Sequence, residues 1–578
     1  MKLSSKGLAL LFVLWTSAGT CLSLDREAFT ITNYDLDVRV EPEQQRLGAR
    51  GKIILRNDSQ AAQKVAVLQI SSSLEWRSIR AGDKPLQFVT QPYTSDIDHT
   101  GALSEAIVTL PSPVAPQGTT ELEIAYEGVI PLDATRLTRI GTPEDAAASS
   151  DWDQISPKFT AVRGAGNVAW YPIATESANL SEADGLFDVL GRWKAREAAS
   201  KVHVHISVFR DDGEEPQEIL VNEASCKVMY EEIGRNSVHS ADCAFLPLGL
   251  RAPLFVAANY QFIQRPNMVV HYQRGHDASA ASYADAGEKV ISLITDWFGA
   301  PHEKAVIADL ADSNAAPFES GSLLLVPLGN TDLKVMGLVA VHQFAHAAFS
   351  SPRPWINEGL AHFAQVLYLE QSKGRQAALD YMGLHRAAFS EAEKPSTAPR
   401  SEDETNRSLV NTASEELYRS KAMCVWWMLR EMIGDSALKK ALASYRPERD
   451  KEPSYMPQLI QAQTQRDLEW FFDDWVYRDR GLPDFKVESA LPRKTLNNSY
   501  MSTITVVNLG TAGGEVPLIV KFAGEEVTKR LVVHAKDKAV IRIETPAMPA
   551  EVVVNDGSVP ESDMTNNTFK VEAGDAAK

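Results

Sequence analysis

Hydrophobic and polar residues follow three different patterns along the chain. Up to about residue 264, short runs such as "YDLDVRVEP", "GKIILRN" and "KVHVHISVF" alternate apolar with polar residues and are separated by Pro, Gly and Asp turns. An alternation of period two is typical of antiparallel strands that bury one face. We therefore expect an N-terminal antiparallel β domain of sandwich type, at residues 24–268.

The pattern then changes to a helical period. Segments such as "YADAGEKVISLITDWFG", "NEGLAHFAQVLYLEQ" and "LYRSKAMCVWWMLREMIG" repeat apolar residues three and four positions apart. They predict a mainly helical domain at residues 269–484, interrupted by a polar surface loop from Ser390 to Glu415. Alternating runs return in "MSTITVVNLG" and "GEVPLIVKFAG", which predict a small β-sandwich at residues 485–572. The expected fold class is thus α+β with several domains.

Composition agrees with several folded domains. The chain has 578 residues, of which 44% are apolar and 23% charged, as in ordinary globular proteins. Its 58 basic and 76 acidic residues give a net charge of −18. Such a charge repels phosphate backbones and anionic lipids, so we expect no nucleic-acid partner.

The first 23 residues have the pattern of a secretory signal peptide. Lys2 and Lys6 precede an apolar run, Gly7 to Trp15, and small residues follow it. This run is shorter than the roughly 20 apolar residues that a membrane span needs. We therefore predict an exported protein, periplasmic or extracellular, with no membrane span after removal of the signal peptide. A single membrane anchor is the alternative, and the residues before Cys21 do not favour lipid modification.

Three further cysteines follow the signal peptide. Export permits disulfides, and the segment between Cys226 and Cys243 could return as a hairpin, so their bridge stays an open question. Cys424 lies within "MCVWWML", where we expect a small buried apolar residue rather than a reactive thiol.

Two histidines four positions apart suggest a metal site. His342 and His346 lie in "VHQFAHAAF", and residues four apart share one face of a helix, so both can bind one zinc ion. The following "SSPRP" must end this helix, and the next helix, in "WINEGLAHF", carries Glu358 near its start. Two histidines and a carboxylate leave a fourth position open, as in catalytic zinc sites. The alternative is a pair of histidines placed by chance on an amphipathic helix.

These motifs resemble the membrane alanyl aminopeptidase (aminopeptidase N) family of gluzincin metallopeptidases. In that family an HExxH helix precedes a helix with W-L-N-E-G, and "WINEG" matches it, with Glu358 at the ligand position. "APFESG" resembles the G-x-M-E-N element, which implies that Glu319 holds the amino terminus of a peptide. "LYRSKAMCVWWMLREMIG" resembles the segment whose tyrosine stabilises the oxyanion, which implies this role for Tyr418.

The resemblance also implies a zinc cofactor, peptides with a free amino terminus as partners, and an order of β domain, thermolysin-like domain and β-sandwich. The chain departs from the family in several places. About eighteen residues usually separate the second His from the Glu, whereas eleven, Ala347 to Asn357, stand here. Gln365, at the usual count, is a poor ligand, so the motif favours Glu358. Phe318 and Ser320 replace Met and Asn of the amino-end element, and we expect no C-terminal helical domain.

The largest departure is Gln343, which stands where the family has the general base. An amide can orient a water but cannot accept its proton, and loss of a general base typically costs about 10²–10⁴ in rate. Zinc binding should survive, because Gln343 is not a ligand. For Glu319 and Tyr418, a surface carboxylate and a core aromatic are the alternatives. We expect His362, one turn after Glu358, to support the site rather than bind the metal.

Two functions therefore remain open. The first is a zinc metallopeptidase that acts on the amino end of peptides, with hydrolysis impaired by Gln343. The second is an inactive pseudopeptidase, a zinc-stabilised protein that binds or organises peptides. A structural protein without metal is a weaker third possibility, and the sequence leaves the oligomeric state unknown.

Overall fold

The computed structural model describes most of the chain between residues 24 and 572. The described ranges are 24–181, 186–210, 218–222, 226–233, 236–301, 304–330, 332, 335–392, 408–410, 412, 414, 416–478 and 480–572. The predicted signal peptide and most of the predicted polar loop lie outside the described residues.

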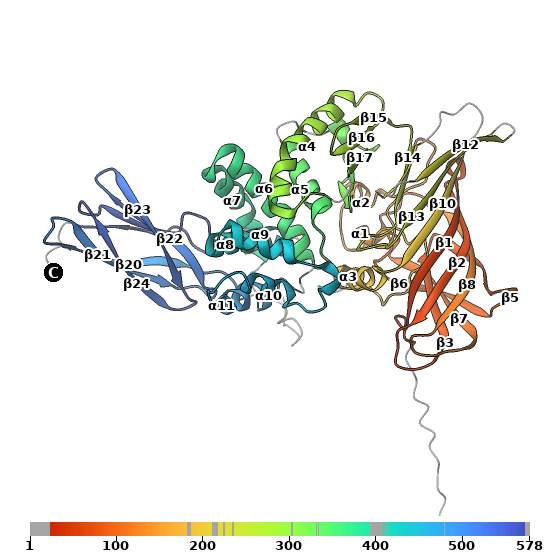
Figure 1. Cartoon of the computed structure of the whole chain (residues 1–578), viewed down its shortest axis with the longest axis horizontal. Helices are drawn as coiled ribbons and strands as arrows, with labels where there is room; N and C mark the ends of the chain where they lie inside the picture. Colours follow the sequence, from red (N-terminus) through yellow and green to blue (C-terminus); the bar gives the residue numbers. More distant parts are fainter. Residues whose placement is uncertain are drawn as a thin grey trace, which may run out of the picture.

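The N-terminal part is built around an eight-stranded sheet, seen at the right of Figure 1. Its strands, in spatial order, are β12 (Lys227–Ile233), β13 (Asn236–Phe245), β10 (Lys201–Arg210), β1 (Phe29–Glu41), β2 (Arg46–Asn57), β8 (Thr119–Val129), β4 (Leu74–Ala81) and β5 (Lys84–Pro85). Two three-stranded sheets accompany it: β3 (Gln63–Ser71), β7 (Ala102–Val114) and β6 (Phe88–Thr94); and β11 (Glu218–Val221), β14 (Phe255–Ala258) and β9 (Phe159–Val162).

The expectation of a purely antiparallel β domain is wrong at one pair of strands. β1 and β10 run parallel, with Asn33 opposite Lys201 and Val40 opposite Val208. A parallel pair needs a long crossover, and more than 150 residues separate these strands. The crossover includes helices, namely α1 (Thr135–Arg139), α2 (Glu144–Ser150) and α3 (Leu186–Glu197). The sequence periodicity identified the strands but could not show which of them are neighbours.

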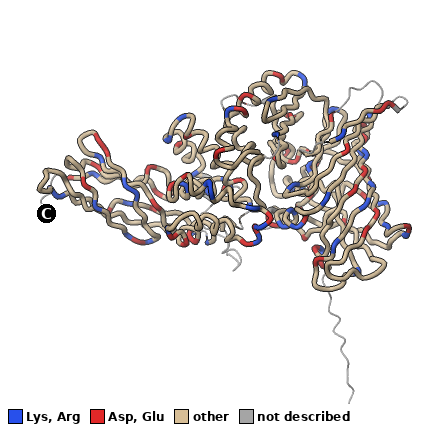
Figure 2. Tube along the Cα trace, viewed as in Figure 1, with Lys and Arg blue, Asp and Glu red and all other residues tan. Residues whose placement is uncertain are grey.

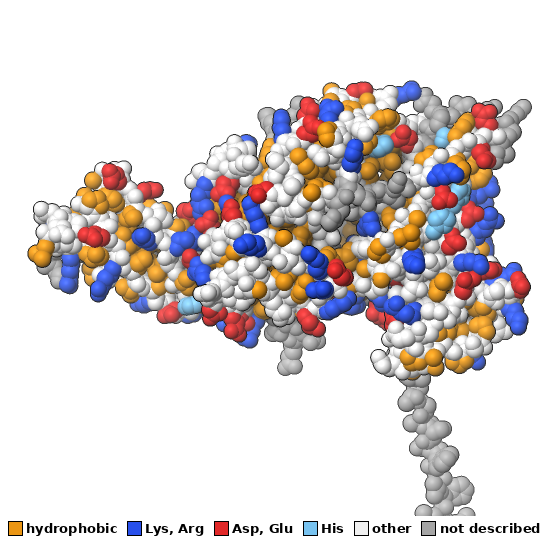
Figure 3. Space-filling view, in the orientation of Figure 1, with side chains coloured by type: hydrophobic (Ala, Val, Ile, Leu, Met, Phe, Trp, Pro, Cys, Tyr) orange, Lys and Arg blue, Asp and Glu red, His pale blue; other side chains and the backbone are white. Residues whose placement is uncertain are grey.

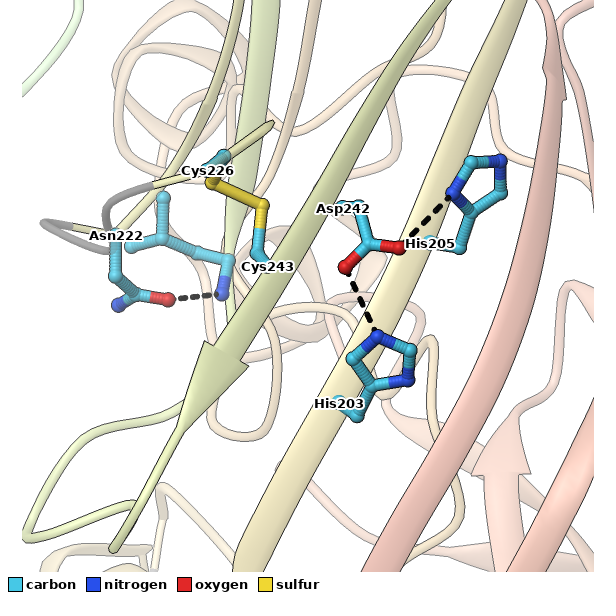
Figure 4. The surroundings of a disulfide bond; sticks show 7 residues. His203, His205, Asn222, Cys226, Asp242 and Cys243 are labelled. Carbon is cyan, nitrogen blue, oxygen red and sulfur yellow. Dashed lines mark hydrogen bonds and ion pairs between the residues drawn. A yellow bond between two sulfur atoms is a disulfide. The ribbon is translucent and has the colours of Figure 1, made fainter. Parts of the chain in front are cut away.

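Cys226 and Cys243 form a disulfide, which answers the open question (Figure 4). Cys243 lies on β13 and Cys226 immediately precedes β12, and these strands pair antiparallel. The hairpin brings the two Cα atoms to 4.5 Å, within the range that a disulfide spans. Cys424 is buried, as expected.

The middle part combines a five-stranded sheet with helices. The strands, in spatial order, are β15 (Gln261–Gln264), β16 (Met268–Tyr272), β17 (Ala305–Asp309), β19 (Leu323–Val326) and β18 (Phe318–Ser320). The three inner strands run parallel and the two edge strands antiparallel to their neighbours. The main helices are α4 (Asp277–Phe298), α5 (Met336–Ala348), α6 (Pro354–Lys373), α7 (Arg375–Ala392), α8 (Ala422–Ile433), α9 (Asp435–Ser444), α10 (Tyr455–Gln461) and α11 (Glu469–Phe472).

The C-terminal part, blue in Figure 1, consists of two small sheets. One contains β20 (Phe485–Lys494), β21 (Tyr500–Asn508) and β24 (Lys538–Thr545). The other contains β23 (Glu525–Val533), β22 (Gly514–Phe522), β25 (Glu551–Val554) and β26 (Thr568–Lys570). The buried indole of Trp475 donates a hydrogen bond to Gly513 O at 2.8 Å and so ties the helical part to this sandwich.

The three parts follow one another along the long axis of the molecule (Figure 1). Acidic and basic residues are both spread over all three parts in Figure 2, and Figure 3 shows charged side chains interspersed with hydrophobic ones over the face in view. Among the described residues, no helix is both long and apolar enough to cross a membrane.

Candidate metal and peptide site

Two consecutive helices of the middle part carry the predicted metal ligands. α5 ends at Ala348, and the next residue, Phe349, has an extended backbone. α6 begins with Pro354 at its first position. Proline cannot continue a preceding helix but suits a first turn, so "SSPRP" separates the two helices as expected. The connection is short, and α5 packs along α6.

The structure brings His342 and His346 of α5 against Glu358 of α6. Nε2 of His346 lies 3.4 Å from Oε1 of Glu358, and Nε2 of His342 lies 3.9 Å from Oε2. The rings of His342 and His346 are 4.9 Å apart between centroids. All three predicted ligands therefore converge on one point.

His362 also belongs to this cluster, which the sequence did not predict. Its ring centroid lies 4.9 Å from that of His342. One possible ligand atom each of His342, Glu358 and His362 lies within 4.8 Å of the other two. This position allows His362 either to support the site, as expected, or to bind the metal itself.

The imidazoles are suited to bind a metal. Burial lowers the pKa of His342 and of His362 well below the ordinary value, so both rings are neutral near neutral pH. Each histidine of this cluster has one buried ring nitrogen that makes no hydrogen bond to the described residues: Nδ1 of His342, Nε2 of His346 and Nδ1 of His362. Buried polar atoms are rarely left unpaired, and a metal ion beside Glu358 would satisfy Nε2 of His346, which faces that carboxylate. His342 turns its other nitrogen, Nε2, toward Glu358.

Glu358 is held in its ionised form. Burial opposes its ionisation, but His346 and Arg419 outweigh burial, so the pKa of Glu358 is lowered overall. Nε of Arg419 lies 3.4 Å from Oε2 of Glu358. A carboxylate that stays charged is a ligand available to a cation at neutral pH.

The "WINEG" segment is fixed by close packing against α8. The rings of Trp355 and Trp426 stack at 5.2 Å between centroids, and Trp426 Nε1 donates a hydrogen bond to Trp355 O at 3.2 Å. A Cβ on Gly359 would lie 2.7 Å from Cβ of Ala422, so only glycine fits there. This packing fixes Glu358, the residue before Gly359. Asn357 orients His346, because its Nδ2 lies 3.1 Å from His346 Nδ1.

Gln365 stands where the family's usual spacing would place the third ligand, but its amide is hydrogen-bonded elsewhere. Its Nε2 donates a hydrogen bond to Leu338 O at 3.0 Å, and its Oε1 accepts one from Tyr381 at 2.9 Å. Both ends of the amide are therefore used to join α6 to its neighbours, and Glu358 is the side chain of α6 that faces His342 and His346.

Gln343 is buried between α5 and α4. The hydroxyl of Tyr283 on α4 donates a hydrogen bond to Gln343 Oε1. Its Nε2 makes no hydrogen bond of normal geometry among the described residues, although the amide lies close enough to Glu319 to favour the ionised carboxylate. Gln343 therefore offers a neutral amide at this position and no group that accepts a proton near neutral pH.

Glu319 lies close to the cluster, and Tyr418 lies on an element that packs against α6. Glu319 lies on the edge strand β18, which packs against α5; burial raises the pKa of its carboxyl, and His346 opposes that shift. Tyr418 is buried in a π-helical segment, Glu416–Lys421, that packs against α6. Its sequence neighbour Arg419, 40% exposed, contacts Glu358.

Helix α3 brings the N-terminal part up to this site. A Cβ on Gly191 would lie 2.9 Å from Pro352 O in the α5–α6 connection, so the two segments are in close contact. Burial lowers the pKa of Lys194 on α3, and the charge of Glu358 opposes this shift. The sequence analysis missed Lys194, Arg419 and Tyr283, because no motif marks them and only tertiary packing brings them to the site.

The structure is similar to solved zinc metallopeptidases. An M1 zinc metallopeptidase from Deinococcus radiodurans, a mutant bound to a Tyr-Ser-Ala substrate, matches with a TM-score of 0.54 at 15% identity, over 80% of this chain and 97% of that one. The fold is that of the M1 zinc metallopeptidases. A second structure of a mutant of this Deinococcus radiodurans metallopeptidase matches with a TM-score of 0.51 at 17% identity, again over 80% of this chain and 97% of that one. No family profile matches the sequence, and no curated protein is similar to it.

Proposed function

We propose that this protein binds zinc and the amino end of peptides at the site between α5 and α6, and that its hydrolysis of peptides is impaired. Zinc is held in this proposal by His342, His346 and Glu358. When bound, it supplies Lewis-acid polarisation of a carbonyl and a site for water. The metal is supported by the unpaired, buried Nε2 of His346 beside Glu358 and by the approach of Nε2 of His342 to the same carboxylate.

Glu319 is assigned the ammonium group of the peptide. Burial raises the pKa of the Glu319 carboxyl group, and an ammonium group beside it would favour the charged form. Tyr418 is assigned the developing oxyanion, which rests on the sequence motif and on the position of its π-helical segment against α6. The structure of a similar metallopeptidase is described as bound to a tripeptide, which supports a peptide as the ligand.

The single observation that carries the loss of hydrolysis is Gln343. It lies between the two histidines on α5, is 1% exposed, and accepts a hydrogen bond from Tyr283. At the position where a peptidase needs a proton acceptor, this protein has a neutral amide. An inactive pseudopeptidase that binds peptides without turnover is the second candidate, favoured by the same observation.

We further propose that the protein is exported. The pattern of residues 1–23 and the disulfide between Cys226 and Cys243 support an oxidising compartment outside the cytoplasm.

The test combines metal analysis, peptide binding and hydrolysis of aminoacyl amides. Protein purified without chelator should contain one zinc per chain, and His342→Ala should reduce that content, whereas Gln365→Ala should not. Binding of a free peptide with slow turnover supports the proposal. Binding with no turnover identifies the pseudopeptidase. Absence of zinc, or strong zinc-dependent turnover by the natural sequence, would contradict the proposed function.

A further inference from the structure

We propose that His362 is a fourth protein ligand of the metal, so that His342, His346, Glu358 and His362 close its coordination sphere. The inference rests on the proposed zinc site. It goes beyond that site because the ligand set taken from the motif has three members and leaves a position open.

The four side chains form two pairs of equal spacing. His342 and His346 are four apart on α5, and Glu358 and His362 are four apart on α6. Residues four apart lie on the same helix face, with Cβ atoms about 5–6 Å apart. Two neighbouring helices therefore each present a pair of ligands to the space between them, an arrangement suited to a tetrahedral ion.

The distances agree with a site that needs only small adjustments. Ligand atoms at zinc bond lengths of about 2.0–2.1 Å lie roughly 3.3 Å apart in a tetrahedron. Oε1 of Glu358 lies 3.4 Å from Nε2 of His346, and its other oxygen, Oε2, lies 3.9 Å from Nε2 of His342. His362 offers an atom within 4.8 Å of both His342 and Glu358. The possible ligand atoms within 4.8 Å of one another belong to His342, Glu358 and His362. Side-chain rotation would have to bring His346 to the same ion.

His362 has one ring nitrogen, Nδ1, that the proposal assigns to the metal. Its Nδ1 is buried and makes no hydrogen bond to the described residues. The nearby ring of His385, at 6.0 Å between centroids, has its own partner, since its Nδ1 lies 3.1 Å from Oγ of Ser420. An imidazole nitrogen buried without a partner is costly, and bonding to the metal would offset that cost.

The number of protein ligands decides what the metal can do. Structural zinc sites have four protein ligands, whereas catalytic sites have three and keep one position for water or substrate. A fourth ligand from His362 would occupy that position. Together with Gln343, it would remove both the proton acceptor and the place where the attacking water binds. The metal would then mainly join α5 to α6, which favours the pseudopeptidase of the two candidate functions.

X-ray absorption spectroscopy of the zinc-loaded full chain tests the inference directly. We expect three imidazoles and one carboxylate oxygen around zinc in the natural sequence. In His362→Ala the imidazole count should fall to two. Zinc affinity, measured by competition with a chromogenic chelator, should fall by more than about 100-fold, beyond the 10–100-fold typical of residues that only support a ligand. His385→Ala, which removes the neighbouring ring, should leave the imidazole count unchanged.

A cobalt-substituted protein provides a second measurement. The natural sequence should show the intense visible absorption of four-coordinate cobalt and no change on addition of azide, whereas His362→Ala should respond to azide. Zinc held by only two imidazoles in the natural sequence would overturn the inference alone, even if a variant did not fold. A natural protein without zinc would overturn the proposed function as well.

Discussion

The hydroxyl of Tyr283 on α4 donates a hydrogen bond to Gln343 Oε1, at the position where hydrolysis requires a base. This contact fixes the amide of Gln343 with its oxygen toward Tyr283. Its nitrogen, Nε2, is then turned toward Glu319. A carboxylate could accept the same hydrogen bond from Tyr283. The surroundings of residue 343 are therefore compatible with glutamate. Replacing this one side chain would supply the missing base.

Restoring hydrolysis should require two changes. Gln343→Glu supplies a proton acceptor, and His362→Ala opens a coordination position for water. We expect the double variant to hydrolyse an aminoacyl amide about 10²-fold faster than His362→Ala alone, which is the usual contribution of a general base. The rates are measured at matched zinc content.

Gln343→Met in the His362→Ala background is the control, because it has similar volume and no basic group. An equal gain in this control would show that repacking rather than a base is responsible. A full gain in Gln343→Glu alone would show that the coordination position is already open.

Glu319 should recognise the free amino terminus of a peptide. A charge-assisted hydrogen bond is worth roughly 1.5–3 kcal/mol, so Glu319→Gln should weaken binding of a free peptide by about that amount. The same peptide with an acetylated amino terminus should bind weakly to both proteins. Calorimetric titration checks this, and equal affinities of the natural protein for the two peptides would refute the assignment.

The strands and helices were predictable from the sequence because they follow local periodicity. The end of α5 and the start of α6 followed from Pro352 and Pro354, and the site position of Glu358 followed from the motif around it. Gln365 shows why spacing alone is a weaker guide, since its amide joins α6 to Leu338 and Tyr381.

Other features depend on contacts between distant segments. The parallel pairing of β1 with β10 and the approach of α3 to Pro352 are tertiary arrangements that no local pattern encodes. His362 was visible in the sequence at the right helical spacing, but its closeness to His342 depends on how α6 is rotated against α5. Packing of Gly359 against α8 sets that rotation.

Gly359→Ala should therefore destabilise the protein. The added methyl group would lie 2.7 Å from Cβ of Ala422 and 2.9 Å from Nε1 of Trp426, and such overpacking typically costs about 1–3 kcal/mol. Gly383 on α7 is the control, because nothing lies within 4 Å of its added Cβ. Gly383→Ala should be neutral or stabilise by up to about 1 kcal/mol through helix propensity. Thermal unfolding of both variants measures the difference, and equal effects would contradict the packing argument.

Glu197, at the end of α3, should make stability fall as the pH rises. Its carboxyl group is fully buried and accepts hydrogen bonds from Ile31 N and from Oγ of Ser200, each at 3.2 Å. Burial raises its pKa from 4.5 to about 7. The folded protein therefore keeps a proton on Glu197 that the unfolded chain has lost above pH 4.5.

The contribution of this group to stability is complete below pH 4.5 and is lost as the pH rises through 7. The gap of roughly 2.5 pH units corresponds to at most about 3 kcal/mol. Glu197→Gln cannot ionise, so its melting temperature should rise relative to that of the natural protein between pH 4.5 and pH 8. Glu525 is exposed. The melting temperature of Glu525→Gln should therefore equal that of the natural protein over the same pH range. A constant offset between Glu197→Gln and the natural protein over this pH range would show that Glu197 is not protonated in the folded state.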